Sequence, residues 1–316
     1  MKNHAFLFPG QGSQTVGMGR DLFMDSEFAK KTFTLADEIL GYHFSRICFE
    51  GPEETLKLTA NTQPALLTVS YILYMLWQKE PCLAAGHSLG EYSALLCAGA
   101  FSFEDAINLV HKRGMYMQEA VPVGVGAMAA LIGADIDIVR QTIAAVNGEN
   151  AGAPAGPEGV KRVVNLANWN SATQIVISGE KSAVEEAARR LAVKTVFLPV
   201  SAPFHSELML PAEEKLALDL DRVKFSDLKF PVINNWQALR VTRADDVREG
   251  LKKQVSRPVL WQAIMETMLQ EYAIDHFSEI GTGKVLAGLL KRAARDKQRE
   301  VQIVNIENMA DLKKNA

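Results

Sequence analysis

The chain has 316 residues, a length that allows one large α/β domain or a large domain that carries a smaller insert. Its composition, 48% hydrophobic and 22% charged, is that of an ordinary globular protein, and its net charge of -3 gives no electrostatic reason to expect nucleic acid or an anionic membrane as a partner. The longest apolar stretch, residues 64–77, is too short to span a bilayer, and the apolar run at residues 5–9 is too short for a signal peptide.

The three cysteines, Cys48, Cys82 and Cys97, lie far apart with no C-x-x-C spacing. They therefore indicate neither a disulfide framework nor a zinc site. We predict reduced thiols in a cytoplasmic protein that holds no metal ion.

The first 120 residues alternate short apolar runs with helical patterns. The expected elements are a strand at 5–8, a glycine-rich loop at 9–14, helices at 21–40 and 61–79, a strand at 82–85, a helix from Glu91 and a helix at 103–119. Strands that alternate with helices predict a mainly parallel sheet with helices on its faces.

The stretch from residue 126 to residue 200 has a different order of elements. We expect a strand at 127–132, a helix at 136–146, strands at 162–167 and 174–178, a helix at 182–191 and a strand at 194–200. This β-α-β-β-α-β order predicts an inserted ferredoxin-like subdomain at 125–200, within a core formed by 1–124 and 201–316. Residues 147–160, rich in Gly, Ala and Pro, are expected to form an exposed mobile loop rather than a site.

After residue 200 the larger pattern resumes. The expected elements are a helix at 207–219, a strand at 230–234, helices at 246–255 and 261–272, a strand at 274–280 that ends in Gly281-Thr282-Gly283, a helix from Lys284 and a strand at 301–306. The sequence has no internal repeat and no low-complexity segment.

Residues 86–90 read Gly-His-Ser-Leu-Gly, the G-x-S-x-G pattern of a nucleophile elbow. In such an elbow two glycines let a strand reverse sharply into a helix. The turn exposes the serine hydroxyl beside backbone N–H groups and the positive end of the following helix. Because a strand precedes the motif and a helix follows it, the pattern predicts Ser88 as a nucleophile; a purely structural glycine turn is the alternative.

A serine nucleophile needs a base, and six histidines are available. His205 follows an expected strand and precedes a helix, a position that catalytic bases favour, although a structural loop histidine is the alternative. His87 adjoins the serine but points away from a sharp turn. The other four histidines have contexts typical of structural or surface residues: His4, His43, His111 and His276.

A hydrolase triad would also require an Asp or Glu between Ser88 and His205 in chain order. The candidates do not stand at clear strand ends: Asp105, Asp135, Asp137 and Glu158. A backbone carbonyl could orient the imidazole instead.

Arg113 lies in a helix that is apolar over much of its surface. If its side chain points inward, it needs an anion, and a substrate carboxylate bound through two hydrogen bonds is the natural one. A solvated arginine beside Lys112 is the alternative.

Together the motifs resemble those of malonyl-CoA:acyl-carrier-protein transacylases, the acyltransferases of fatty acid and polyketide synthesis. Eight motifs occur in the same order as in that family, between residues 5 and 306. They are Phe8-Pro9-Gly10-Gln11-Gly12-Ser13-Gln14, Thr62-Gln63-Pro64-Ala65, Gly86-His87-Ser88-Leu89-Gly90-Glu91, Arg113-Gly114 with Met117-Gln118, Asn168-Trp169-Asn170, Pro203-Phe204-His205, Arg257-Pro258-Val259-Leu260-Trp261 and Gly281-Thr282-Gly283.

The resemblance implies an α/β-hydrolase-like core with a ferredoxin-like subdomain, in agreement with the order of elements. It implies that Ser88 is the nucleophile and His205 the base, and that the main-chain carbonyl of Gln254 orients the histidine. The N–H groups of Leu89 and Gln11 would form the oxyanion hole.

In the same way, Arg113 would pair with the malonyl carboxylate, and the acyl pocket would be lined by Met117, Asn170 and Phe204. The resemblance further implies that the enzyme moves malonyl from malonyl-CoA to the phosphopantetheine thiol of an acyl carrier protein, as a monomer without a bound cofactor. The chain departs from the family in a longer loop at 147–160 and in Phe204, where many stand-alone enzymes have a smaller residue. A phenylalanine there is expected to favour malonyl over methylmalonyl.

Two other functions are compatible with parts of the pattern. A serine esterase or thioesterase would use water as the acceptor, and it would be favoured by a carboxylate on His205 and an apolar acyl pocket. A catalytically silent relative would only dock carrier proteins. The sequence does not distinguish fatty acid from polyketide synthesis.

Overall fold

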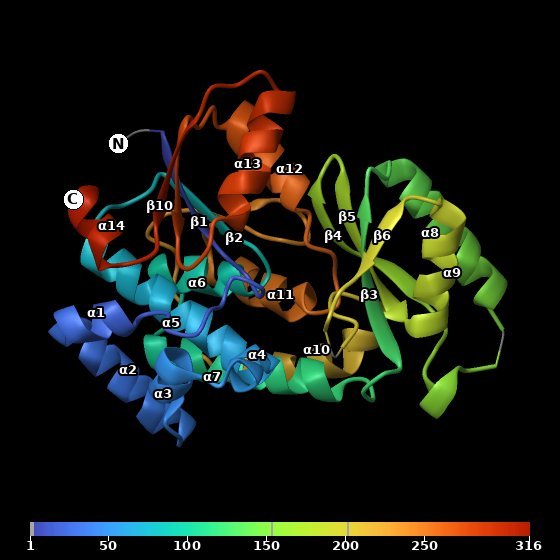
Figure 1. Ribbon diagram of the computed structural model, residues 1–316, viewed down its shortest axis with the longest axis horizontal. Helices are drawn as coiled ribbons and strands as arrows, with labels where there is room; N and C mark the ends of the chain where they lie inside the picture. Colours follow the sequence, from blue (N-terminus) through green and yellow to red (C-terminus); the bar gives the residue numbers. More distant parts are fainter. Residues whose placement is uncertain (1–2, 153, 201) are drawn as a thin grey trace.

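The computed structural model describes residues 3–152, 154–200 and 202–316. Met1, Lys2, Ala153 and Ser201 lie outside these ranges, so the domain boundary predicted at residue 201 and one position of the predicted loop 147–160 are not described. Figure 1 shows a larger part, which contains both termini and most helices, and a smaller part with β3–β6, α8 and α9.

The larger part is built on a six-stranded sheet in the order β10-β9-β1-β2-β7-β8. Adjacent strands are parallel except for the terminal pair, β7 and β8. The strands are β1 His4–Phe8, β2 Leu83–Gly86, β7 Val232–Ile233, β8 Arg240–Val241, β9 His276–Ile280 and β10 Gln302–Ile306. The mainly parallel sheet predicted from the sequence is confirmed.

Helices cover both faces of this sheet. Before the insert they are α1 Arg20–Asp25, α2 Glu27–Leu40, α3 Phe44–Glu50, α4 Glu53–Lys57, α5 Thr59–Trp77, α6 Leu89–Cys97 and α7 Phe103–Glu119. After it they are α10 Leu210–Leu220, α11 Ala244–Gln254, α12 Trp261–Glu266, α13 Val285–Asp296 and α14 Met309–Lys314, with a 3-10 turn at Glu207–Met209 and a π turn at Thr267–Glu271. Within the described residues, none of the helices combines the length and the apolarity needed to cross a membrane.

The side chains of β1 pack alternately into two hydrophobic cores, one on each face of the sheet. Phe6 and Phe8 are buried with residues of α2, α5 and α7, whereas Ala5 and Leu7 are buried with residues of α12 and α13. Because successive side chains of a strand point to opposite faces, a strand covered on both sides has to be apolar throughout. This explains the uninterrupted apolar run at the start of the chain.

The smaller part is a four-stranded antiparallel sheet in the order β4-β5-β3-β6. Its elements are β3 Gly126–Ile132, α8 Ile136–Asn150, a 3-10 turn Pro157–Gly159, β4 Val164–Ser171, β5 Gln174–Glu180, α9 Lys181–Leu191 and β6 Lys194–Phe197. The helices α8 and α9 pack on this sheet through an apolar core of their own. This is the ferredoxin-like arrangement predicted from the sequence, while the boundaries 1–124, 125–200 and 201–316 stay a prediction.

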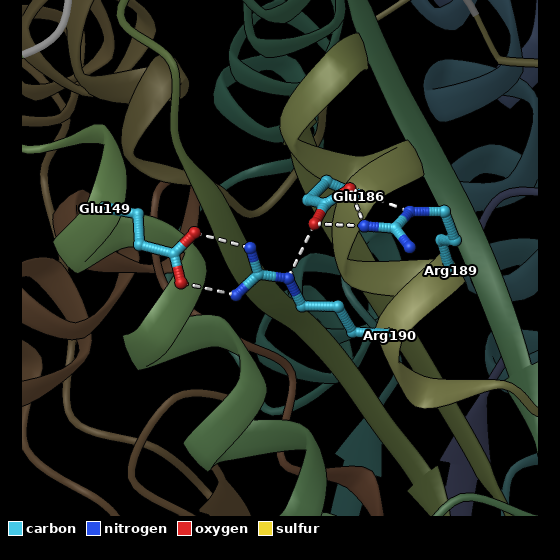
Figure 2. Close-up of polar contacts among 4 residues, drawn as sticks. All are labelled: Glu149, Glu186, Arg189 and Arg190. Carbon is cyan, nitrogen blue, oxygen red and sulfur yellow. Dashed lines mark hydrogen bonds and ion pairs between the residues drawn. The ribbon is translucent and has the colours of Figure 1, made fainter.

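Charged side chains connect α8 to α9 on the outside of the smaller part (Figure 2). Arg190 donates to both carboxylate oxygens of Glu149 and also to Glu186, which in turn accepts from Arg189. These side chains are between 30% and 73% exposed. They therefore form a network in water on the surface of the subdomain.

Several boundaries differ from the predictions for local reasons. The helix predicted at 21–40 is two helices, because Ser26 caps the second by accepting a hydrogen bond from the Ala29 N–H. The loop predicted to begin at residue 147 begins after Asn150, because the Asn147 side chain bonds both the N–H and the C=O of Val164 and keeps the last turn of α8 in place. Three short helices and one short strand were not predicted: α3, α4, α14 and β8; the 3-10 turn Pro157–Gly159 was not predicted either.

Candidate active site

Ser88 lies in the turn between β2 and α6, at the carboxyl end of the parallel strands. Its φ of 52° and ψ of -104° are unusual for a residue with a side chain. A Cβ on Gly86 would come within 1.9 Å of the Gly90 backbone, and one on Gly90 within 2.0 Å of the Phe8 oxygen. Only glycines at these two positions let β1, β2 and α6 approach closely enough to form the turn.

The hydroxyl of Ser88 lies 2.8 Å from Nε2 of His205. The other ring nitrogen, Nδ1, is 3.0 Å from the backbone oxygens of both Gln254 and Arg257. Because carbonyl oxygens only accept hydrogen bonds, Nδ1 carries the proton, and Nε2 is left to accept from the serine. The imidazole is thus oriented by two carbonyl groups.

The turn that supplies these carbonyls is itself anchored. Glu213 of α10 accepts hydrogen bonds from Ser256 and, at 2.7 Å, from Lys253. The Glu213 side chain is nearly buried, and its two partners lie on either side of Gln254 in the sequence. These contacts tie the turn to α10, which begins just after His205.

His205 is only 3% exposed. Burial, together with the positive charge of Arg113, lowers the pKa of His205 to about 3. The imidazole is therefore neutral at neutral pH, which is the form that can take a proton from a hydroxyl or a thiol.

Arg113 of α7 points inward and is 1% exposed. Its guanidinium donates to Gln63 Oε1 at 2.8 Å, to Gln254 Oε1 at 2.9 Å and to Ser88 Oγ at 3.1 Å, and it lies over the Tyr92 ring. In the described part of the chain no carboxylate lies within ion-pair distance of it. The site thus holds a buried cation, beside a hydroxyl, whose hydrogen-bond partners are all neutral.

A buried carboxylate, Glu91, lies behind these groups and is 2% exposed. It accepts from Gln254 Nε2 at 2.7 Å and from the Asn235 N–H at 3.0 Å. Burial raises the pKa of Glu91 to about 7, so this carboxyl is only partly ionised at neutral pH. It fixes the Gln254 amide, whose oxygen faces Arg113.

Ser88, His205 and Arg113 face one cavity of about 130 Å³, which is also lined by Gln11, Leu89, Met117 and Phe204. Pockets for drug-sized ligands are usually about 300–1,000 Å³. The cavity therefore has room for a short acyl group rather than for a long chain.

Comparison with known proteins places this geometry in a family. The family model described as acyl transferase domain matches residues 5–312. The chain belongs to the acyl transferase family. Two relatives, both named malonyl CoA-acyl carrier protein transacylase, come from Escherichia coli strain K12 and Bacillus subtilis strain 168. They are 44% and 45% identical, over 92% and 93% of this chain and 93% and 92% of the relatives.

Solved structures of similar acyl transferases agree over almost the whole chain. An acyl carrier protein S-malonyltransferase from Vibrio cholerae has a TM-score of 0.90 and 39% identity, covering 99% of this chain and 100% of that one. A malonyl-transacylase in complex with a type II PKS acyl-carrier protein has a TM-score of 0.89 and 39% identity, with 99% and 98% coverage. The predicted α/β class with its additional antiparallel sheet is confirmed.

Seven of the nine predicted site residues of this acyl transferase line the cavity, and two do not. Gln254 lies behind it, where its backbone oxygen contacts His205 and its side chain contacts Arg113. Asn170, predicted to line the acyl pocket, instead bonds His87 Nε2 at 2.8 Å through its side-chain oxygen. Asn168, two residues earlier in β4, lines the cavity.

Other residues at the site of this acyl transferase were not predicted. Gln63 and Glu91 lie in two of the eight motifs, but nothing in those motifs shows that Gln63 contacts Arg113 or that Glu91 contacts Gln254. For Asn235, no sequence motif indicates a position at the site. Met128, close to the first residue of β3, also lines the cavity, so the small sheet contributes to the pocket wall.

Proposed function

We infer that this acyl transferase moves a malonyl group from malonyl-CoA to the phosphopantetheine thiol of an acyl carrier protein, through a malonyl ester on Ser88. Its relatives from E. coli and B. subtilis are named for this reaction. The observation that carries the proposal is the buried guanidinium of Arg113, which has only neutral partners and lies 3.1 Å from the Ser88 hydroxyl. An acyl group that ends in a carboxylate supplies the missing anion.

In the first half-reaction Ser88 attacks the thioester carbon of malonyl-CoA. The neutral His205 takes the hydroxyl proton on Nε2 as the Oγ–C bond forms. When the C–S bond breaks, the histidine gives this proton to the departing CoA thiol. The malonyl group is then held as an ester on the serine.

The carbonyl oxygen that becomes negative in this step needs N–H donors. The N–H of Leu89 is in the first turn of α6, where helical N–H groups have no partner within the helix and the dipole favours negative charge. Gln11 follows β1 and lines the same cavity. We propose the N–H groups of Leu89 and Gln11 as the oxyanion hole.

Arg113 has two effects on the malonyl group. Its guanidinium selects the carboxylate, because a neutral acyl group would leave the buried charge unpaired. The bound carboxylate also offsets the positive charge that lowers the pKa of His205, so the imidazole is a stronger base when malonyl is present than when acetyl is present. Both effects favour malonyl. The Phe204 ring crowds an α-methyl branch, which favours malonyl over methylmalonyl.

In the second half-reaction the carrier-protein thiol replaces CoA. His205 takes the thiol proton, the sulfur attacks the ester carbon, and the proton returns to Ser88 as the Oγ–C bond breaks. Atoms and charges balance without any further reactant. We also propose that the enzyme acts in the cytoplasm as a monomer without a bound cofactor, on the basis of its composition and family.

A serine esterase or thioesterase is the alternative enzyme. The orientation of His205 by two carbonyl groups, rather than by the carboxylate of a hydrolase triad, supports the transferase. The buried guanidinium of Arg113 in the acyl pocket also supports the transferase, because an esterase for neutral acyl groups would be expected to have an apolar pocket.

The test is to mix the protein with malonyl-CoA and to measure both CoA release and the mass of the protein. A transacylase releases a burst of one CoA per chain and gains one malonyl group, which Ser88→Ala does not gain. Continued CoA release without carrier protein would indicate an esterase, and no release would indicate a silent docking module. An undiminished adduct on Ser88→Ala would place the nucleophile elsewhere.

A further inference from the structure

The side chain of Asn235 lies against the nucleophile elbow, just beyond the end of β7. Asn235 is fully buried. Its Oδ1 accepts the N–H of Ser88 at 2.6 Å, and its Nδ2 donates to the oxygen of Gly86 at 2.7 Å. Both polar groups of the carboxamide are therefore bonded to the backbone of the elbow.

These two bonds extend the pairing of β2 with β7 beyond the last pair of backbone partners. The strand β2 pairs in parallel with β7 at Ala84↔Val232 and Ala85↔Ile233. In a parallel ladder a residue bonds the C=O before its partner and the N–H after it. The oxygen of Gly86 and the N–H of Ser88 flank His87 in this way, so the Asn235 carboxamide takes the place of the next backbone partner.

The position of Asn235 is itself fixed on two sides. Its backbone N–H donates to Glu91 Oε2 at 3.0 Å, and its backbone oxygen accepts from the Leu260 N–H at 2.8 Å. Gln254, which also contacts Glu91, donates to the backbone oxygen of Ser88 at 3.0 Å. The backbone of the serine is thus held at its N–H by Asn235 and at its oxygen by Gln254.

Such a clamp is needed because the φ of Ser88 is positive. A strained backbone persists only when the surrounding structure holds it. If Ser88 relaxed, its Oγ would move away from His205, and the start of α6 would move with it.

We propose that Asn235 is a positioning residue whose carboxamide holds Ser88 in the strained conformation that aims its hydroxyl at His205. The inference rests on the proposed role of Ser88 as the nucleophile. Because Asn235 does not line the acyl cavity, its loss is expected to slow acylation with little change in the KM for malonyl-CoA.

Two variants test this, because they differ in their response to pH. Asn235→Ala removes both bonds and is expected to lower the acylation rate about 100-fold at every pH, the cost of a misplaced reacting group. Asn235→Asp keeps the shape but, when ionised, turns an acceptor toward the oxygen of Gly86. When protonated, the carboxyl can again donate to Gly86 and accept from Ser88. Burial beside Glu91 should raise the pKa of this new aspartate.

The expected result is that Asn235→Asp is as slow as Asn235→Ala at about pH 8, and at least about 10-fold faster than Asn235→Ala at about pH 5.5. The rate measured is the burst of CoA release on rapid mixing with malonyl-CoA. Because His205 titrates in both variants, the ratio of the two rates removes its contribution.

Asn234→Asp is the matched control, since it introduces the same charge at the adjacent residue. The Asn234 side chain bonds Gln237 and Leu239 within its own turn and makes no bond to the elbow. Asn234 is only 3% exposed, but an aspartate keeps the oxygen that accepts from Gln237 and Leu239 and leaves the elbow untouched. This variant should therefore stay within about three-fold of the wild-type rate at both pH values. Far-UV circular dichroism and thermal melts establish that each variant is folded.

The inference is overturned if Asn235→Ala acylates within three-fold of the wild type, if the two variants share one pH profile, or if the loss is entirely in KM. If Asn235→Asp does not fold, the acylation rate and the KM of Asn235→Ala still test the inference, because this variant adds no buried charge. The absence of a malonyl adduct on the wild type would instead overturn the proposed function.

Discussion

On the outside of the small antiparallel sheet, four charged side chains of α8 and α9 are exposed and paired, whereas at the elbow of the large sheet the guanidinium of Arg113 is buried and forms no ion pair. Glu149, Glu186, Arg189 and Arg190 form a network in water (Figure 2). Arg113 is almost completely buried and contacts neutral amides and a hydroxyl. Exposed pairs contribute little to stability, while an uncompensated buried charge is costly.

This difference separates charged side chains that only stabilise the surface from a buried one whose presence is explained by a ligand. A buried guanidinium without a carboxylate in contact destabilises the free protein, so it is explained by the anion that binds there. The surface network needs no such explanation, because removing it exposes nothing that was buried. Substitutions in the two regions should therefore have very different consequences.

The largest effect is expected for His205→Ala. Loss of a general base should reduce the rate of CoA release from malonyl-CoA by roughly two to four decades, with a smaller change in affinity. Rapid-mixing measurement of the burst rate against malonyl-CoA concentration separates the two quantities. A loss of less than ten-fold at neutral pH would mean that His205 is only a loop residue.

Arg113→Ala should follow closely, with a loss that depends on the substrate. A malonyl carboxylate left buried without its partner should cost about 3–5 kcal/mol, or roughly two to three and a half decades in transfer. Acetyl transfer should hold or rise, because no guanidinium is left unpaired, so the preference inverts. Parallel acylation of a carrier protein from acetyl-CoA and malonyl-CoA measures this. Equal losses for both substrates would contradict the carboxylate role.

A smaller effect of the same substitution concerns pH. In the wild type burial, and after it the positive charge of Arg113, lowers the pKa of His205 to about 3, so the neutral imidazole is lost only when the pH falls through that range. Removing the positive charge of Arg113 should raise this pKa, while burial still holds it below its usual value near 6.5. The acid limb of acetyl-CoA acylation, followed between about pH 4 and about pH 8, should therefore move to higher pH in Arg113→Ala. Identical limbs would show that the two side chains do not interact.

The smallest effect is expected in the surface network. Glu149→Gln removes one exposed ion pair with Arg190 and should shift the melting temperature by no more than about 2 °C. Malonyl transfer should be unchanged. A clear loss of activity in this variant would mean that the small sheet transmits its stability to the site, and the contrast between the two regions would fail.

Much of the architecture could be predicted because it depends on local patterns. The apolar run of β1 and the G-x-S-x-G motif are signals carried by neighbouring residues, and they indicated the parallel sheet and the elbow. The β-α-β-β-α-β order likewise indicated the small sheet. Boundaries set by a single side chain were missed, as at Ser26 and Asn147, because one capping residue looks like any other polar residue in a sequence.

The site was predicted in part, for a similar reason. Ser88 and His205 were candidates because each stands at a strand end, and family resemblance added Arg113 and the others. Asn235 was not found, since its contact with Ser88 joins residues 147 positions apart and depends on where β7 ends. Asn168 lines the cavity where Asn170 was expected, and Asn170 lies at an irregularity in the pairing of β4 with β5 that an N-x-N motif does not reveal.

The loop between α11 and α12 joins the two sheets through Val259. Val259 N–H donates to the Ala167 oxygen, and Trp169 N–H donates to the Val259 oxygen, both at 2.9 Å, so this loop is hydrogen-bonded to the edge strand β4. The carbonyl of Arg257, two residues earlier, is one of those that orient His205. Any rotation of the small sheet relative to the large one would displace this carbonyl and move the imidazole of His205 relative to Ser88. Malonyl-CoA and carrier protein are therefore expected to exchange by way of surface side chains and loops, with the two sheets moving as one body.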